Sequence, residues 1–431
     1  MAQLSYDEKI FVDLTGRNDW SSSLPYGNNS FFYPSVSTSF LVSDLFTLPS
    51  AVSFAKLRFS WAQVGNDTRP YQTDKYYDRV YSNSFTNSST LYNPDLKPEI
   101  TSSYEAGIDV RLFNNRIGID MSVYDNKSRN QILAIPLDPV SGYSNALVNA
   151  GLINSKGIEV MLTGKPVKTK NVEWSTTLTW SRNRSYVREL AEGITNQIIY
   201  SHESNVSIEA RVGGRMGDLY GRGFQRSPEG KIIYSSVGLP APLNPVTKKW
   251  GNAFADWKAG LMNEFTIRSF RISILFDGQK GGSLYSQTNH KSNTLGKTTV
   301  TLPGRDDGII GDGVVAGADG KYSANTIKVP ASSYYDNYYT ISNAETNIFD
   351  ASYVKLREAR VEFNLPQKLL KGIGITQSSV ALYGRELFNF TDFPGFDPEG
   401  GNLNSGTLIP GVELMQFPST RNIGVNLTLK F

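Results

Sequence analysis

The sequence contains no cysteine and only two histidines among its 431 residues. Without cysteine, the chain forms no disulfide, offers no thiolate nucleophile and binds no metal through sulfur. The histidines are His202 and His290, and the sequence has neither a G-x-S-x-G elbow nor a metal-binding histidine pair. Hydrolysis would require one of these histidines to lie within hydrogen-bond reach of a serine. We therefore expect neither an enzyme nor a bound cofactor.

Long apolar runs are also missing. No stretch approaches the roughly 18 uninterrupted apolar residues of a membrane-spanning helix, which excludes a helical membrane protein but leaves a β-barrel open. The net charge is only +3, and no basic block suggests nucleic acid. The first residues, MAQLSYDEKIFVDL, lack the basic start and apolar run of a signal peptide. Because a secreted chain needs such a peptide, its absence conflicts with an outer-membrane location.

The sequence does contain many segments in which apolar and polar residues alternate, as they do along a β-strand with one apolar and one polar face. In the last stretch, RNIGVNLTLKF, the residues Ile423, Val425, Leu427 and Leu429 fall on one face of a strand and polar residues fall on the other. This pattern is typical of a soluble antiparallel sheet and equally of a membrane barrel. With 39% hydrophobic and 12% aromatic residues, the composition suits many strands and turns.

About twelve such strands follow one another along the chain, an even number as bacterial barrels require. They are expected near residues 8–17, 33–44, 56–61, 105–112, 117–124, 158–163, 172–181, 254–267, 270–277, 351–365, 378–390 and 421–431. Within 351–365 the alternation changes phase. A bulge near Arg357 would restore the register, and an extension of the strand beyond the membrane would serve as well.

The connections between these strands fall into two length classes. Short polar turns at 114–116, 165–171, 268–269 and 366–377 alternate with long connections rich in Gly, Ser, Asn, Asp and Pro. The long connections are near 18–32, 66–99, 136–149, 191–253, 286–346 and 395–420. Short turns at one end and long loops at the other indicate a transmembrane, antiparallel, up-and-down β-barrel with periplasmic turns and extracellular loops.

Several longer segments resemble the barrel of SusC/RagA-type TonB-dependent outer-membrane transporters. They include LKPEITSSYEAGIDVRLFNNRIGIDMSVYDNKSRNQIL (96–133), VNAGLINSKGIEVML (148–162), DASYVKLREARVEFNLP (350–366) and LYGRELFNFTDFPGFDPE (382–399). GRNDWSSSLPYGNNSFFYPSVSTSF (16–40) and GRMGDLYGRGF (214–224) belong to the same series. The resemblance covers the whole chain but only the C-terminal half of such a transporter. One departure is Glu386 in GRELF, a position that the family usually gives to Asn.

The resemblance implies a 22-stranded barrel in the outer membrane that imports oligosaccharide or peptide nutrients. It further implies a SusD-like lipoprotein lid, energy supplied through TonB, and a terminal aromatic residue, Phe431, that signals to the barrel assembly machinery. Nothing in the sequence matches the plug domain, the TonB box or the signal peptide. We therefore expect residues 1–431 to be the C-terminal part of the barrel in a truncated or split form, which contacts TonB only through the missing part.

Two other interpretations stay open. Twelve strands leave both termini on the periplasmic side, so the first strand could pair with the last and close a small, passive pore without exposed edges. An outer-membrane barrel lipase or protease is a third possibility that depends on the two histidines.

The loops carry the only candidate sites. Asp306, Asp307, Asp312 and Asp319 cluster among glycines, and such oxygen-rich loops suit calcium, although the spacing is not that of an EF-hand. The loop aromatics Tyr220, Phe224, Tyr334, Tyr335, Tyr338 and Tyr339 could stack on a sugar or grip a peptide. The alternatives are solvated turns for the aspartates and packing of loop against loop for the aromatics.

Overall fold

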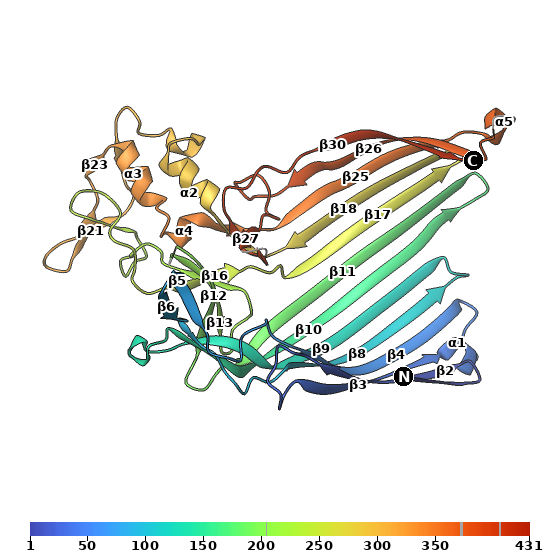
Figure 1. The fold of residues 1–431 in the computed structure, drawn as a ribbon. Coiled ribbons are helices and arrows are strands. Elements are labelled where there is room, and N and C mark those ends of the chain that lie inside the picture. The colour runs from blue at the N-terminus through green and yellow to red at the C-terminus, as the bar shows by residue number, and fades with distance from the viewer. Residues whose placement is uncertain (204, 371–373, 405–406) are drawn as a thin grey trace.

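The computed structural model describes residues 1–203, 205–370, 374–404 and 407–431, and most of them belong to one curved antiparallel sheet (Figure 1). The positions outside this description, 204, 371–373 and 405–406, fall within predicted connections. In the described residues the sheet has fourteen strands, and all except β1 and β7 are nine residues or longer. The twelve long strands are the twelve that alternation predicts, so the up-and-down antiparallel fold class is confirmed.

The strands of the sheet follow one another in chain order. The path is β1 (Ala2–Tyr6), β2 (Ile10–Trp20), β3 (Ser30–Leu41), β4 (Val52–Asn66), β8 (Glu99–Leu112), β9 (Ile117–Pro136), β10 (Asn145–Lys168), β11 (Val172–Glu189), β17 (Trp257–Ile267), β18 (Phe270–Lys280), β25 (Tyr353–Asn364), β26 (Gln377–Phe390) and β30 (Asn422–Lys430), with β7 (Thr90–Leu91) beside β10. Only the two short strands, β1 at the edge and β7 beside β10, were not predicted. Within the described residues β1 pairs only with β2 and β30 only with β26, so the sheet is open.

The two faces of the sheet differ as the alternation predicts. Along β30 the apolar side chains Ile423, Val425 and Leu427 are exposed on one face. On the other face, polar side chains hydrogen-bond between neighbouring strands, as Ser103 does to Asn126 at 2.6 Å. We refer to these as the apolar face and the polar face.

A β-bulge at Arg357 interrupts β25. Leu356 pairs with Phe276 and Glu358 with Leu275, so Arg357 has no partner residue across from it on β18. The pairing with β26 shifts at the same place. The bulge that the sequence predicts near Arg357 is therefore confirmed.

The turns and loops lie at opposite ends of the sheet (Figure 1). At the short-turn end, the chain reverses through residues with left-handed backbone, such as Asn114 and Asn115, and through the short helices α1 (Val42–Leu45) and α5 (Gln367–Leu370). No helix among the described residues is long and apolar enough to cross a membrane.

At the loop end, the long connections form small sheets and helices that the sequence did not predict. The strands are β5 (Tyr77–Tyr81), β6 (Ser84–Asn87), β12 (Asn196–His202), β13 (Val206–Arg211), β14 (Asp218–Gly221), β15 (Ile233–Tyr234), β16 (Lys248–Asn252), β19 (Ser283–Ser286), β20 (Ile309–Ile310), β21 (Val314–Ala316), β22 (Tyr322–Ala324), β23 (Lys328–Val329), β24 (Ile348–Asp350), β27 (Asn402–Asn404), β28 (Thr407–Ile409) and β29 (Val412–Glu413). The helices are α2 (Gln287–Thr294), α3 (Ala331–Tyr338) and α4 (Ala344–Asn347), with 3₁₀ turns at Pro139–Ser141 and Thr299–Thr301.

The buried apolar core also lies at the loop end. Val206 and Ile208 on β13 pack with Leu219 on β14, Tyr285 on β19 and Val412 on β29, and β14, β19 and β29 are far apart in the sequence. The loops are therefore a packed structure that is fastened to the end of the sheet rather than a set of independent connections.

Candidate functional site

The polar face of the sheet is linked by charged side chains. Arg58 on β4 reaches across β8 and donates hydrogen bonds to Asp120 on β9 at 3.2 and 2.6 Å. Its path crosses Gly107, where a Cβ atom would lie 2.4 Å from the Arg58 Nε. The glycine thus leaves the room that the guanidinium needs to join three strands.

Two cavities adjoin each other along this face. The first, which we call the mouth cavity, has a volume of about 440 Å³ and lies between strands β11, β17 and β18 and the loops. Its loop side includes residues 398–401 and 410–411. The second, the wall cavity, measures about 450 Å³ and is lined by Arg58 and Asp120 among others. Ser181 and Lys258 line both cavities, so the two are neighbours along the polar face.

Two opposite charges in this region are unpaired. Lys258 lines both cavities and Glu159 lines the wall cavity, and within the described ranges neither forms an ion pair. Ser181 stands between them, because it pairs with Glu159 on one side and with Lys258 on the other. A polar ligand passing along this face therefore meets a free cation and a free anion.

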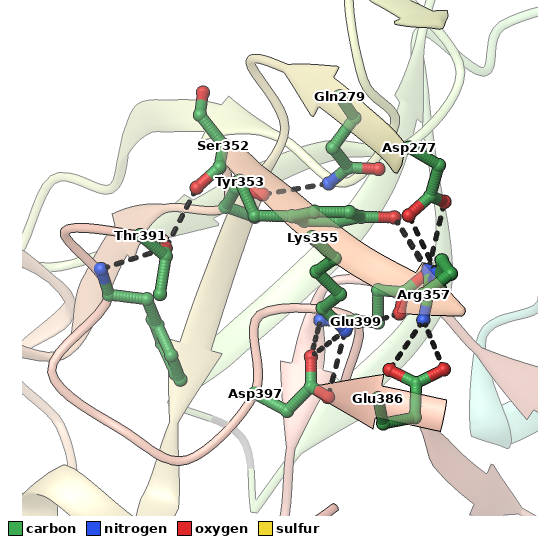
Figure 2. Close-up of polar contacts among 12 residues, drawn as sticks. Asp277, Gln279, Ser352, Tyr353, Lys355, Arg357, Glu386, Thr391, Asp397 and Glu399 are labelled. Atoms are coloured by element: carbon green, nitrogen blue, oxygen red, sulfur yellow. Dashed lines mark hydrogen bonds and ion pairs between the residues drawn. The ribbon is translucent and has the colours of Figure 1, made fainter. Parts of the chain in front are cut away.

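A network of ionic contacts fixes one loop beside the mouth cavity (Figure 2). Lys355, only 1% exposed, donates to Asp397 at 2.7 and 2.9 Å and also to Glu399. Tyr353 donates its hydroxyl hydrogen to Glu399 at 2.6 Å, and Arg357 bonds the same carboxylate. We call these five residues the latch, and we call residues 391–401, which carry Asp397 and Glu399, the latch loop.

Arg357 connects the latch to the neighbouring strands. Its guanidinium donates to both oxygens of Asp277 on β18, at 2.6 and 3.0 Å, and to both oxygens of Glu386 on β26, at 3.0 Å each. The bulge in β25 places this side chain where it can reach both strands and the latch loop at once (Figure 2). Such bidentate, charge-assisted pairs are the stronger class of hydrogen bond.

Glu386 has an unusual backbone. Its φ is 51°, in the left-handed region that Asn tolerates better than Glu. The family resemblance expects Asn at this position. Here the chain accepts the less favourable backbone and supplies a second carboxylate for Arg357.

Glu399 belongs both to the latch and to the lining of the mouth cavity. Burial alone would raise the pKa of its carboxyl, but hydrogen bonds from Arg357, Lys355 and Tyr353 outweigh burial and lower the pKa to about 2. Glu399 is therefore ionised at neutral pH and cannot release the loop by taking up a proton there.

A second ionic cluster also adjoins the mouth cavity. Arg184 and Arg215 both donate to the same oxygen of Asp256, at 3.0 and 3.1 Å, and Arg215 lines the cavity. The Nε of Arg184 is buried and has no hydrogen-bond partner among the described residues.

The predicted loop aromatics other than Tyr220 lie together at α3. Tyr334 stacks on Tyr338 and lies close to Tyr335, while Phe224 packs against Tyr338 with ring centroids 4.8 Å apart. Phe224 and Tyr335 are buried, and so is Tyr220, which stacks under the guanidinium of Arg211. The sequence left two roles open for these aromatics, ligand binding and packing of loop against loop. The contacts in the structure are loop packing, and contact with a substrate stays a prediction.

The other predicted residues lie apart from the cavities. Asp306, Asp307 and Asp312 are exposed, and among the described residues no group of three or more acidic or histidine side chains could hold a metal. The calcium site stays a prediction, as does the assembly role of Phe431, which is 84% exposed.

Among the described residues, no serine lies within hydrogen-bond reach of either histidine ring. His290 Nδ1 bonds the carbonyl oxygen of Tyr339 at 2.7 Å, and His202 Nε2 is buried with no hydrogen-bond partner in the described part of the chain. Burial lowers the pKa of both imidazoles.

Sequence reasoning missed the latch and the free Lys258. For the latch, the signals were the phase change at Arg357 and the acidic pair in DPE at 397–399. Nothing local in the sequence links the two, because they are more than 40 residues apart.

Comparison with known proteins identifies similar chains. A family profile described as "TonB dependent receptor-like, beta-barrel" matches residues 1–244. The chain is 25% identical to the TonB-dependent receptor P3 of Formosa agariphila over 99% of this chain and 44% of the receptor. It is 27% identical to the TonB-dependent receptor SusC of Bacteroides thetaiotaomicron over 41% of this chain and 19% of SusC.

A solved structure has the same fold. The RagAB peptide transporter aligns with a TM-score of 0.77 and 18% identity, and the alignment covers all of this chain and 47% of the transporter chain. The chain thus spans less than half the length of the first relatives it matches.

Proposed function

The chain belongs to the TonB-dependent receptor β-barrel family, and from this premise we propose that it lines the import path of an outer-membrane transporter for oligosaccharides or peptides. Its place is the outer membrane, with the apolar face of the sheet toward lipid and the polar face toward the lumen. The short turns are periplasmic and the long loops extracellular.

One observation carries the proposal. The mouth cavity and the wall cavity share Ser181 and Lys258 in their linings, so adjoining cavities run from beneath the extracellular loops along the lumen wall. The unpaired Lys258 and Glu159 offer a cation and an anion to a polar solute. Peptides carry both charges and oligosaccharides bond through hydroxyls, so both cargoes suit this lining.

The open edges of the sheet support a larger barrel. Edge strands present unpaired N–H and C=O groups, which cost several kcal/mol each in hydrocarbon. We propose that other strands of a longer transporter pair with β1 and β30, and that residues 1–431 provide about half of the wall. The proposed partners are a SusD-like lipoprotein at the loop end, the TonB complex through residues outside this chain, and the barrel assembly machinery.

The experiment compares two tryptophan substitutions on one strand. Ser181→Trp places an indole in both cavities, whereas Leu178→Trp, three residues away on β11, points to lipid. The readout is uptake of labelled peptide and oligosaccharide pools by cells that carry the transporter. We expect Ser181→Trp to abolish uptake of the cargo pool and Leu178→Trp to leave it unchanged. Equal uptake by both variants would remove the support for this path.

A conductance measurement tests the autonomous pore. Steady open-channel current from the purified chain would show that the edges close without other strands, which would favour a passive pore over a transporter wall. We expect no current, because the edge strands of this sheet need further strands of a longer transporter to close a barrel.

A further inference from the structure

The apolar face has a distinct hollow near the loop end. Its volume is about 610 Å³, and it spans strands β3, β4, β8, β9 and β10. The large side chains around it are Val36, Phe59, Trp61, Tyr104 and Val123. The hollow exists because Ala106 is small and leaves a gap among aromatic neighbours. Since this face meets lipid, hydrocarbon must fill the gap.

Positive charge gathers beside this hollow. Lys156 lines it and pairs with Asp125 at 3.0 Å. Lys127 and Arg129 follow Asp125 at alternate positions of β9, so they share its face. Arg182 lies on the next strand across from Ile158, two residues from Lys156.

The charges in this patch do not balance. In the described ranges, Lys127, Arg129 and Arg182 form no ion pair, so these three cations and Lys156 have only the Asp125 carboxylate among them. Arg184, across from Lys156, is paired with Asp256 and adds no free charge. The whole chain has a net charge of only +3, so this excess is a local feature of the outer wall. Cations next to an aromatic hollow at the edge of an apolar band complement a lipid with an anionic head group.

We propose that the hollow binds an acyl chain of an anionic, phosphate-bearing lipid of the outer leaflet, whose phosphate is held by Lys127, Lys156 and Arg182. The loop end of the wall lies in the outer leaflet, and the acyl chain would fill the space over Ala106 between Trp61 and Tyr104. A free phosphate ion would contact only the cations and leave the apolar hollow empty. A lipid contacts both the cations and the hollow, so a lipid is the proposed occupant. The inference depends on the chain's place in the outer membrane and not on what the lumen carries.

Trp61 provides the probe. The protein is transferred from the outer membrane into nanodiscs that contain brominated lipids, whose bromines quench nearby indoles. Brominated phosphatidylglycerol, which is anionic, is compared with brominated phosphatidylcholine, which is zwitterionic and carries the same acyl chains. Subtracting the signal of Trp61→Phe isolates Trp61 from the other five tryptophans.

The expected result is a preference at Trp61 of about fivefold or more for phosphatidylglycerol, since each juxtamembrane cation is worth roughly a fivefold gain toward anionic lipid. The triple variant K127Q/K156Q/R182Q should lose the preference, and Lys258→Gln, which removes a cation from the lumen, should keep it. Ala106→Leu, an apolar change on a lipid-facing position, should fold normally and reduce quenching by both lipids.

Three outcomes would overturn the proposal. Equal quenching of Trp61 by the two lipids would show that the hollow does not select charge. A preference that persists in the triple variant would show that these cations do not hold the phosphate. Loss of the preference when millimolar inorganic phosphate is added would show that the cations form a site for the free ion instead.

Discussion

Replacing Arg357 with glutamine should loosen the latch loop. The change removes one of three donors to Glu399 and leaves those from Lys355 and Tyr353. A hydrogen bond to a charged group contributes about 1.5–3 kcal/mol. The Asp277 and Glu386 carboxylates also lose their partner, which brings the expected loss in loop stability to the upper part of that range, about 2–3 kcal/mol.

Hydrogen exchange measures this loss directly. Local opening of residues 391–401 exposes their amides, so a loss of about 2–3 kcal/mol accelerates their exchange roughly 30- to 150-fold. The measurement uses the membrane-embedded protein in nanodiscs, with residues of β9 as an internal reference whose exchange should not change.

Arg385→Gln is the matched control. Arg385 also lies at this end of β26, but it forms a single, more exposed pair with Glu358 at 2.8 Å. Such a pair contributes about 0–1 kcal/mol, so exchange of the latch loop should change less than fivefold. If Arg357→Gln left the exchange of the loop unchanged, or if both variants accelerated it equally, the latch would not be what holds this loop.

Three further predictions concern single groups. The folded-state pKa of Glu399 is lowered from 4.5 to about 2. The contribution of this carboxylate to latch-loop stability should therefore be complete above about pH 4.5 and decline as the pH falls toward 2. Pepsin cleavage of the loop across that pH range measures the decline. Because burial lowers the pKa of His202 and of His290 from 6.5, the unfolded loops bind protons more readily, so loop stability should fall as pH drops below about 6.5. Protease sensitivity at pH 5 and pH 7 measures this difference. His202→Phe should reduce the difference, and replacing both histidines with Phe should abolish it. Glu386→Asn and Glu386→Gln both remove the carboxylate that pairs with Arg357, but only Asn suits the left-handed backbone. The Asn variant should therefore be more stable than the Gln variant by about 1 kcal/mol in urea unfolding. Equal unfolding midpoints would contradict a backbone cost at this position.

The loops show where sequence reasoning reached its limit. Helix α2 has the sequence QTNHKSNT, which carries no apolar stripe to indicate a helix. It forms because Ser286 caps its first turn at 3.0 Å and because Glu413, over 120 residues later, accepts a hydrogen bond from the Thr288 amide at 3.2 Å. The cap is local, but the distant carboxylate is not visible in a local window of sequence.

The aromatic loop residues illustrate a related limit. Tyrosines spaced as in SSYYDNYY are equally suited to ligand stacking and to packing. Their spatial neighbours decide between these two roles. In the structure those neighbours are other loop aromatics such as Phe224 and Tyr234, which indicates packing.

By itself the sequence determined the twelve long strands, the two faces of the sheet, the sorting of short turns and long loops, and the bulge at Arg357. It did so because side-chain direction in a strand alternates with a period of two, which is a local property. Tertiary structure alone decided that, within the part of the chain that the structure describes, the sheet stays open at β1 and β30 and Lys258 has no ionic partner, and that the latch loop returns to β25. These features depend on contacts between residues far apart in the chain, and such contacts arise only when all the strands have taken their places.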